Sequence, residues 1–157
     1  MTKPEIILLV GNIGSGKSTL VNKLLKKGYN HIVISRDSLR YMIGGGNYRF
    51  DPKLESMIHD MELKIIETCM KNKVNIIVDE VGINKQMRER YIPCAIKNGY
   101  TITVIELPYF SKRTSVNRRM KNPHGQFDRK IWNSVWERFN NLYERPSKKE
   151  GINKIIR

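Results

Sequence analysis

The feature that most constrains the fold is an octapeptide near the amino end, Gly11-Asn12-Ile13-Gly14-Ser15-Gly16-Lys17-Ser18, which fits the pattern G-x-x-x-x-G-K-[ST]. Its glycines let the backbone curl so that N–H groups face the oxygens of a phosphate. The short apolar run 6–10 precedes it as a buried strand would, and a helical pattern follows over 17–27. This context predicts a phosphate-binding loop rather than an ordinary glycine turn.

The rest of the chain alternates between short apolar runs and amphipathic segments. We expect strands at 31–34, 74–78, 101–107 and 152–156, and helices at 38–43, 52–72, 84–96, 111–122 and 128–145. This alternation predicts an α/β fold with a parallel sheet of about five strands, covered by helices on both faces. No repeat, linker or composition break divides the 157 residues, so we expect a single domain over 1–157.

The net charge of +14 limits the kinds of molecule that the chain is expected to bind. A chain this basic attracts polyanions such as nucleic acid, nucleotides or an anionic membrane, although solvated helix faces are the alternative explanation. The apolar run 6–10 is much too short to cross a bilayer, and no membrane partner is expected. Cys69 and Cys94 show no metal-site spacing and suit a reducing cytosol, so we expect a cytoplasmic protein.

The phosphate loop assigns roles to individual residues. Lys17 should reach the β- and γ-phosphates, and Ser18 should bind Mg²⁺. Asp79 ends the apolar run 74–78 and could position the same ion through water, or could be only a helix cap or an ion-pair partner. We expect the nucleotide to contact the following residues: Gly11, Asn12, Ile13, Gly14, Ser15, Gly16, Lys17, Ser18 and Thr19.

A second polar segment, Ser35-Arg36-Asp37-Ser38-Leu39-Arg40, follows the expected strand at 31–34. Ligands of such sheets lie beyond the carboxyl ends of the strands, so Asp37 should face the γ-phosphate. There it could accept the proton of an attacking hydroxyl, and Arg40 could hold a substrate phosphate with two hydrogen bonds. Alternatively, Asp37 only caps the helix starting at Ser38, and Arg40 is a surface residue.

Two further features leave the reaction open. The basic segment 112–121, which contains Arg118 and Arg119, could belong to a mobile lid around 111–127 that closes over the transferring phosphoryl group. A solvated cationic face is the alternative. The turn 122–125 would let the lid move, and we expect His124 to be a loop residue rather than a catalyst. Glu80 leaves a rival function open, because a carboxylate after the strand-ending aspartate can activate water in an ATPase.

Together these segments resemble the kinase domain of phage-type polynucleotide 5′-hydroxyl kinases. The shared features are the phosphate loop, S-R-D-x-x-R at 35–40, V-D-x-x-x-x-N at 78–84, the basic lid and P-x-x-x-E-G at 146–151. The stretch 45–55 is similar to an insert that some members of the family carry. The resemblance implies a P-loop kinase fold, without the phosphatase domain fused to some relatives.

The resemblance also implies roles for the site residues. Lys17 and Ser18 would bind ATP and Mg²⁺, Asp37 would be the general base for the 5′-hydroxyl, and Arg40 would contact the 3′-phosphate of the substrate. Two differences from the family pattern affect the assignment of these roles. The segment 80–82 differs from the Thr-Asn usual in the family, which leaves the substrate surface near Asp79 open. The lid pattern fits Arg118 and Arg119 equally well.

The sequence therefore predicts transfer of the γ-phosphate of ATP to the 5′-hydroxyl end of DNA or RNA. Asp37 would take the proton, and Lys17 with the pair Arg118 and Arg119 would stabilise the developing charge. Single-stranded or 5′-end nucleic acid would be the partner, and a ligase would act downstream. Two alternatives stay open: a kinase for a nucleoside or metabolite, and a nucleic-acid-binding NTPase. The sequence predicts no oligomeric state.

Overall fold

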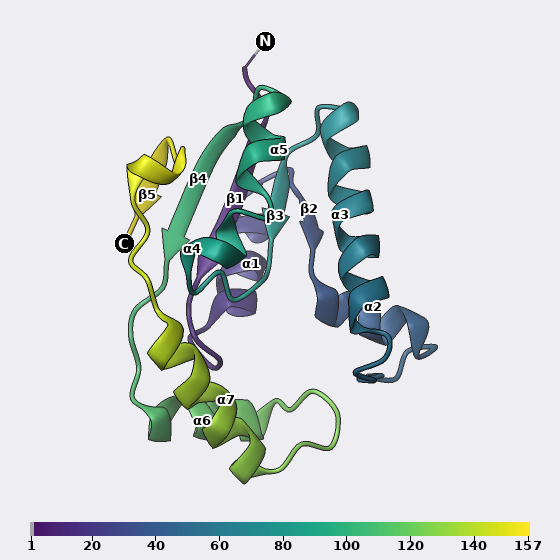
Figure 1. Ribbon diagram of the computed structural model, residues 1–157, viewed down its shortest axis with the longest axis vertical. Helices are drawn as coiled ribbons and strands as arrows, with labels where there is room; N and C mark the ends of the chain where they lie inside the picture. Colours follow the sequence, from purple (N-terminus) through teal and green to yellow (C-terminus); the bar gives the residue numbers. More distant parts are fainter. Residues whose placement is uncertain (1) are drawn as a thin grey trace.

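The computed structural model describes residues 2–157 and contains a five-stranded parallel sheet of order β2-β3-β1-β4-β5 (Figure 1). Ile6 of the central strand lies opposite Ile76 on one side and Ile102 on the other. The prediction of a parallel α/β sheet with about five strands is confirmed. The strands are β1 (Glu5–Val10), β2 (Ile32–Ile34), β3 (Ile76–Val78), β4 (Thr101–Glu106) and β5 (Lys154–Ile156).

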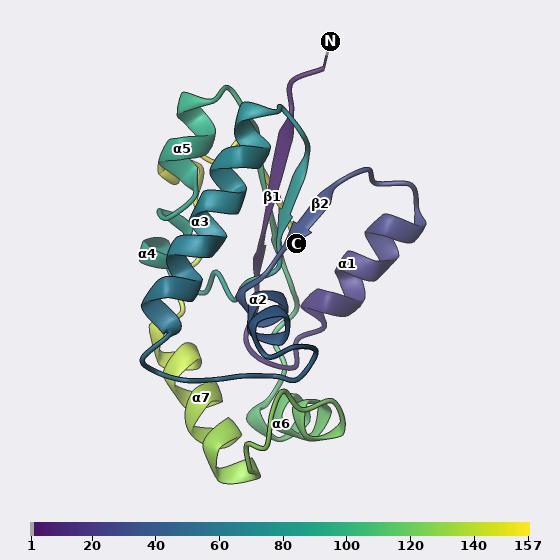
Figure 2. The same ribbon diagram turned by 90° about the vertical axis from the view of Figure 1, so that its right-hand side faces the viewer.

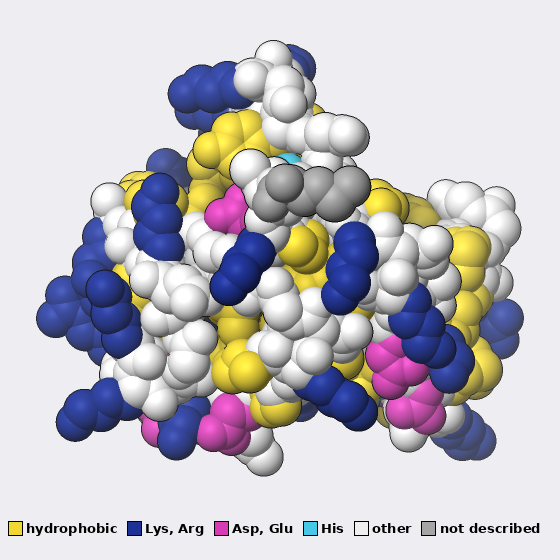
Figure 3. Space-filling model, turned by 90° about the horizontal axis from the view of Figure 1, so that it is seen from above, with side chains coloured by type: hydrophobic (Ala, Val, Ile, Leu, Met, Phe, Trp, Pro, Cys, Tyr) yellow, Lys and Arg dark blue, Asp and Glu magenta, His cyan; other side chains and the backbone are white. Residues whose placement is uncertain are grey.

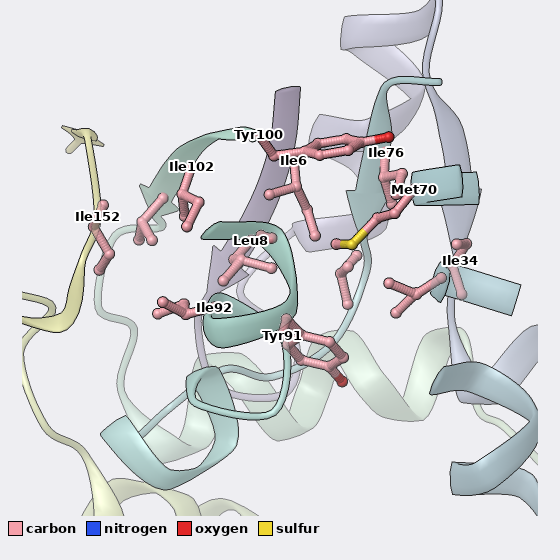
Figure 4. Packing of buried hydrophobic residues seen from close by; sticks show 14 of the residues in the cluster. Ile6, Leu8, Ile34, Met70, Ile76, Tyr91, Ile92, Tyr100, Ile102 and Ile152 are labelled. Carbon is pink, nitrogen blue, oxygen red and sulfur yellow. The ribbon is translucent and has the colours of Figure 1, made fainter. Parts of the chain in front are cut away.

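The central strand is apolar throughout because helices cover both faces of the sheet. Its alternate side chains Ile6 and Leu8 point into one core cluster, and Ile7 and Leu9 point into another. The first cluster is packed by α3 (Glu55–Lys71) and α5 (Ile92–Lys97), and Figure 4 shows its side chains. The second is packed by α1 (Lys17–Lys26), which lies on the opposite face of the sheet (Figure 2).

A third apolar cluster lies beyond the carboxyl ends of the strands. It joins Ile13 of the phosphate loop to Val116 of α6 (Lys112–Lys121) and to Trp132 and Trp136 of α7 (Arg129–Leu142). The two helices run below the sheet in Figure 1, at the end where the strand arrows point. This packing brings the predicted lid segment into contact with the phosphate loop.

The expected single helix over 84–96 is wrong, because the structure has two: α4 (Lys85–Arg88) and α5. The predicted cap is present, since the side chain of Asn84 accepts the N–H of Met87 at 2.9 Å. Pro93 explains the break, because it has no N–H to donate to a preceding turn and is tolerated only at the start of a helix.

The final helix ends at Leu142, earlier than Pro146 predicts. Tyr143 leaves the helical conformation, and the next N–H, that of Glu144, donates to the carbonyl of Ile83 at 2.9 Å. Farther along, the 3-10 turn η1 (Lys148–Glu150) is buttressed by Glu150, whose carboxylate accepts two hydrogen bonds from the buried guanidinium of Arg88. The tail thereby fixes the loop that follows β3.

The helix α2 (Arg36–Ile43) begins earlier than expected. Ser35 caps it, because its side-chain oxygen accepts the N–H of Ser38 at 3.1 Å. The alternative in which Asp37 is merely the cap is therefore wrong, and Asp37 lies in the first turn with its side chain free for other contacts. No helix within residues 2–157 is both long and apolar enough to span a bilayer.

Candidate active site

The phosphate loop connects β1 to α1 at the carboxyl end of the sheet. Gly14 and Gly16 adopt positive φ angles of 64° and 96°, which favour glycine. Gly16 caps α1 with no side-chain hydrogen bond, so the first N–H groups of the helix remain available to an anion. The Ser15 hydroxyl is buried and has no hydrogen-bond partner within residues 2–157. These unpartnered donors fit the phosphates of a nucleotide.

The side chain of Lys17 reaches back to the backbone of the phosphate loop. Its Nζ donates to the carbonyls of Gly11 at 2.8 Å and Asn12 at 2.9 Å. Burial lowers the pKa of Lys17 to about 8, although the nearby Asp79 opposes this shift. Within residues 2–157 the Lys17 ammonium forms no ion pair and is held by two neutral carbonyls, and the phosphates of a nucleotide would supply a charged partner.

Ser18 and Asp79 are in direct contact at the carboxyl end of the sheet. The Ser18 hydroxyl donates to Oδ2 of Asp79 at 2.9 Å, across the gap between α1 and the end of β3. Burial raises the pKa of Asp79, which identifies a carboxylate that a cation would stabilise. Two neighbouring oxygen atoms of this kind fit Mg²⁺, which prefers oxygen ligands and retains several waters. Ser18 would hold the ion directly, with Asp79 acting through water.

The carboxylate of Asp37 is held by three side chains from different segments. Its Oδ1 accepts from Arg40 Nη1 at 2.7 Å and from the Tyr48 hydroxyl at 2.9 Å. Its Oδ2 lies 3.4 Å from Nε2 of His124. Burial opposes ionisation, but His124, Tyr48 and Arg40 together lower the pKa of Asp37 below its ordinary value. Asp37 is therefore ionised at neutral pH.

Arg40 is already engaged by two carboxylates. Its Nε donates to Glu55 at 2.9 Å, its Nη2 also contacts Glu55, and its Nη1 binds Asp37. The side chain is 12% exposed. A substrate phosphate would have to replace Glu55 at this guanidinium, a requirement that the sequence pattern does not reveal.

The two lid arginines occupy different positions. Arg119 lines the cleft with its guanidinium over the Trp132 ring, 5.1 Å from the ring centroid. Arg118 instead contacts the Phe110 ring at 4.0 Å and donates to the carbonyl of Gly14 at 3.3 Å. Only Arg119 of the pair therefore borders the cleft that contains the phosphate-loop lysine and the candidate base.

That cleft has a volume of about 780 Å³. Its lining brings together the following predicted site residues: Ile13, Lys17, Ser18, Asp37, Arg40, Asp79 and Arg119. A second cavity of about 710 Å³ lies on the other side of the phosphate loop and is lined by Gly11, Asn12 and Ser15 of the loop together with Tyr109 and Tyr143. The loop therefore separates two spaces, one on the Asp37 side and one on the β4 side.

Sequence reasoning missed the contacts of Tyr48 and His124 with Asp37. Tyr48 lies in the stretch similar to a family insert, and His124 lies in the lid turn, as predicted for a loop residue. The two rings stack with centroids 5.2 Å apart. No pattern of spacing joins these residues, so only their residue types, a tyrosine and a histidine beside glycines, could have drawn attention to them.

Comparison of the sequence with known protein families identifies the family of the chain. The sequence model of the Zeta toxin family matches residues 1–146. The chain belongs to the Zeta toxin family. It is thus a member of a P-loop kinase family, and the predicted P-loop kinase fold is confirmed. The resemblance to phage-type polynucleotide kinases is a more specific assignment than membership of this family.

This Zeta toxin family member is similar to parts of two longer proteins. NEDD4-binding protein 2 from Homo sapiens is 26% identical over 127 residues, which make up 80% of this chain and 7% of that protein. A chain of the Pnkp1/Rnl/Hen1 RNA repair complex shares 20% identity with a TM-score of 0.69, covering 92% of this chain and 47% of that one. The chain therefore spans about half or less of these two relatives.

A third similarity is to APS kinase CysC of Mycobacterium tuberculosis in complex with AMPPNP and APS. The identity is 15% and the TM-score 0.62, with 99% of this chain and 89% of that one covered. Likenesses at this level concern the fold alone. Because a chain from an RNA repair complex and an APS kinase both share it, the acceptor has to be argued from the site.

Proposed function

We propose that this chain transfers the γ-phosphate of ATP to the 5′-hydroxyl end of a polynucleotide. The observation that carries the proposal is the position of Asp37, an ionised carboxylate in the same cleft as Lys17 and the Ser18–Asp79 pair. A base placed opposite a phosphate loop serves a hydroxyl acceptor. The S-R-D-x-x-R segment that carries it is the part of the sequence most specific to polynucleotide kinases in the resemblance.

The two spaces beside the phosphate loop suggest how ATP lies. The γ-phosphate must face the cleft that contains Asp37, because the acceptor hydroxyl has to reach both. The nucleoside then extends the other way, into the cavity bordered by Tyr109 and Tyr143. Aromatic side chains of this kind suit the flat face of a base.

The transfer itself uses few protein groups. Asp37 accepts the proton as the acceptor oxygen forms its bond to the γ-phosphorus, and the bond from that phosphorus to the bridging oxygen breaks to release ADP. Lys17 and Arg119 offset the charge that develops on the phosphoryl oxygens. Mg²⁺ held at Ser18 would neutralise charge on the β- and γ-phosphates when it is bound.

The lid and Arg40 have narrower proposed roles. We propose that segment 111–127 moves to admit and release substrates, because it contributes Arg119 and His124 to the cleft. Arg40 orients Asp37, and it would bind a 3′-phosphate only by exchanging Glu55 for that group. The product, a 5′-phosphorylated end, is the chemical form that a ligase consumes.

The basic surface supports a polymeric acceptor. Lys and Arg exceed Asp and Glu by 14. Lys and Arg side chains are spread also over the end of the molecule remote from the cleft (Figure 3), so the excess positive charge is a property of the whole surface and acts on a polyanion at long range. Positive charge of this extent adds a salt-sensitive attraction that a small acceptor would not need.

The test compares acceptors and salt concentrations. With γ-labelled ATP, we expect a 5′-hydroxyl oligonucleotide to accept phosphate far better than a nucleoside 3′-monophosphate. We also expect the oligonucleotide KM to rise about tenfold or more between 50 and 200 mM salt if roughly three phosphates are contacted. Equal use of both acceptors, with no effect of salt, would contradict a polymeric substrate and favour a small-molecule kinase.

A further inference from the structure

The glycine-rich insert and the lid turn meet above the candidate base. Tyr48 of the insert stacks on His124 of the lid turn, with the ring planes 19° apart, and Tyr41 of α2 packs edge-on against both. A second aromatic pair, Phe50 with Phe127, joins the same two segments at 5.5 Å. Two loops far apart in sequence thus form a single aromatic contact over the cleft.

Both loops direct a polar atom at the Asp37 carboxylate. The Tyr48 hydroxyl donates to Oδ1, the oxygen that also accepts from Arg40. His124 places Nε2 3.4 Å from Oδ2, while its Nδ1 lies 3.3 Å from the Tyr41 hydroxyl. Oδ1 therefore carries two short hydrogen bonds, whereas Oδ2 has one longer contact and retains more unused capacity to accept a hydrogen bond.

Space at the lid turn is tight where the two loops touch. A Cβ built on Gly125, which has a φ of 65°, would lie 3.0 Å from the Tyr48 ring. The glycine next to His124 thus permits the turn to approach the insert closely enough for the rings to stack. The local backbone and the side-chain contacts hold the Tyr48 hydroxyl and the His124 ring beside Asp37.

We propose that Tyr48 and His124 are positioning residues for Asp37, holding its carboxylate so that Oδ2 is the atom that takes the proton of the acceptor hydroxyl. The proposal rests on the proposed function, in which Asp37 is the base. It gives the glycine-rich insert a role, because the insert carries Tyr48. It also makes the geometry of the base depend on lid closure, because His124 is part of the lid.

The same contacts set how readily the carboxylate is protonated. Tyr48, His124 and Arg40 stabilise its ionised form. Other charged groups near it are Lys17 of α1, Asp79 after β3, Glu55 of α3, which binds the same Arg40, and, close to His124, Arg119 of α6. Replacing Tyr48 by phenylalanine keeps the ring for stacking and removes the hydroxyl. Replacing His124 by phenylalanine keeps a ring but removes the contacts with both Asp37 and Tyr41.

The experiment measures the pKa of the Asp37 carboxyl by carbon-13 NMR titration of the nucleotide-free full chain. The proteins compared are the wild type, Tyr48→Phe, His124→Phe and the control Tyr29→Phe, whose ring lies beside His31 away from the cleft. We expect the pKa of Asp37 to rise by about one unit in Tyr48→Phe, and to rise also in His124→Phe. The acid limb of the kcat/KM profile should move to higher pH by the same amount, with no change in the control.

Three outcomes distinguish a failure of the positioning role from a failure of the proposed kinase function. An unchanged carboxyl pKa in both variants, or lower kcat with an unmoved acid limb, would overturn the positioning role and leave only a structural one. A raised pKa together with the moved limb supports it. A raised pKa in a protein whose wild type phosphorylates no oligonucleotide would support the arrangement around Asp37 and contradict the proposed acceptor.

Discussion

Glu80 binds Arg36 at two points. Its Oε1 accepts the backbone N–H of Arg36 and its Oε2 accepts Nη2 of the same residue, both at 2.7 Å. This pair ties the end of β3 to the first turn of α2, one residue before Asp37. Because both oxygens of Glu80 are used, the contact favours a structural role over the activation of water that a carboxylate in this sequence position can perform.

The Glu80→Gln variant tests this role. The amide would place its NH₂ group against the Arg36 guanidinium, so the start of α2 should shift and phosphate transfer should fall about tenfold through misplacement of Asp37. Glu89→Gln, an exposed partner of Lys85, is the matched control and should be unaffected. A different result would identify the protein as an NTPase. In that case the wild type would hydrolyse ATP faster than it transfers phosphate to any hydroxyl acceptor, and Glu80→Gln would abolish the hydrolysis.

Glu62 predicts how stability depends on pH. The side chain is fully buried on α3, and burial together with the charge of Glu80 raises its pKa to about 7, although Arg36 opposes the shift. The folded state therefore binds more protons than the unfolded chain between about pH 4.5 and 7, and the contribution of Glu62 to stability is lost as the pH rises through this range.

We expect Glu62→Gln to gain stability relative to the wild type as the pH increases. The difference in free energy of unfolding between variant and wild type should grow by about 1–3 kcal/mol from pH 5 to pH 8, measured by urea denaturation. Glu67→Gln on the same helix is the exposed control and should show no such trend. A difference that stays constant with pH would mean that Glu62 is as readily ionised in the folded protein as in the unfolded chain.

The lid arginines should differ in their effect on catalysis. Arg119→Ala removes the cation that borders the cleft and should lower kcat by about 10²-fold or more. Arg118→Ala loses only the contacts with Phe110 and the Gly14 carbonyl, so its kcat should fall by less than about tenfold. Steady-state kinetics of the two variants provide the check. A larger loss in Arg118→Ala would place that residue at the transferring group instead.

Much of the fold could be predicted because its signals are local. The apolar run at 6–10, the glycines of the loop and the alternation of strands with helices each depend on neighbouring residues, and together they specify the parallel sheet. The break between α4 and α5 was missed although Pro93 signals it, because the apolar spacing continues across it. The true cap of α2, Ser35, was missed because Asp37 is an equally plausible capping residue.

The candidate site was predictable only as far as its segments carry recognisable patterns. Lys17, Ser18 and Asp79 meet as the strand ends imply. The engagement of Arg40 by Glu55, and of Asp37 by Tyr48 and His124, depends on how three distant segments pack, which residue spacing does not encode. The choice between the two lid arginines likewise required their orientation around α6.

The central claim is that Asp37 serves as the base of a polynucleotide 5′-kinase. The most direct measurement is transfer of γ-labelled phosphate from ATP to a 5′-hydroxyl oligonucleotide by the wild type and Asp37→Asn, with nucleotide affinity measured in parallel. We predict labelled oligonucleotide with the wild type, a loss of about 10²–10⁴-fold in the variant, and ATP affinity similar in both. Free labelled phosphate without labelled oligonucleotide, or full transfer by Asp37→Asn, would contradict the account.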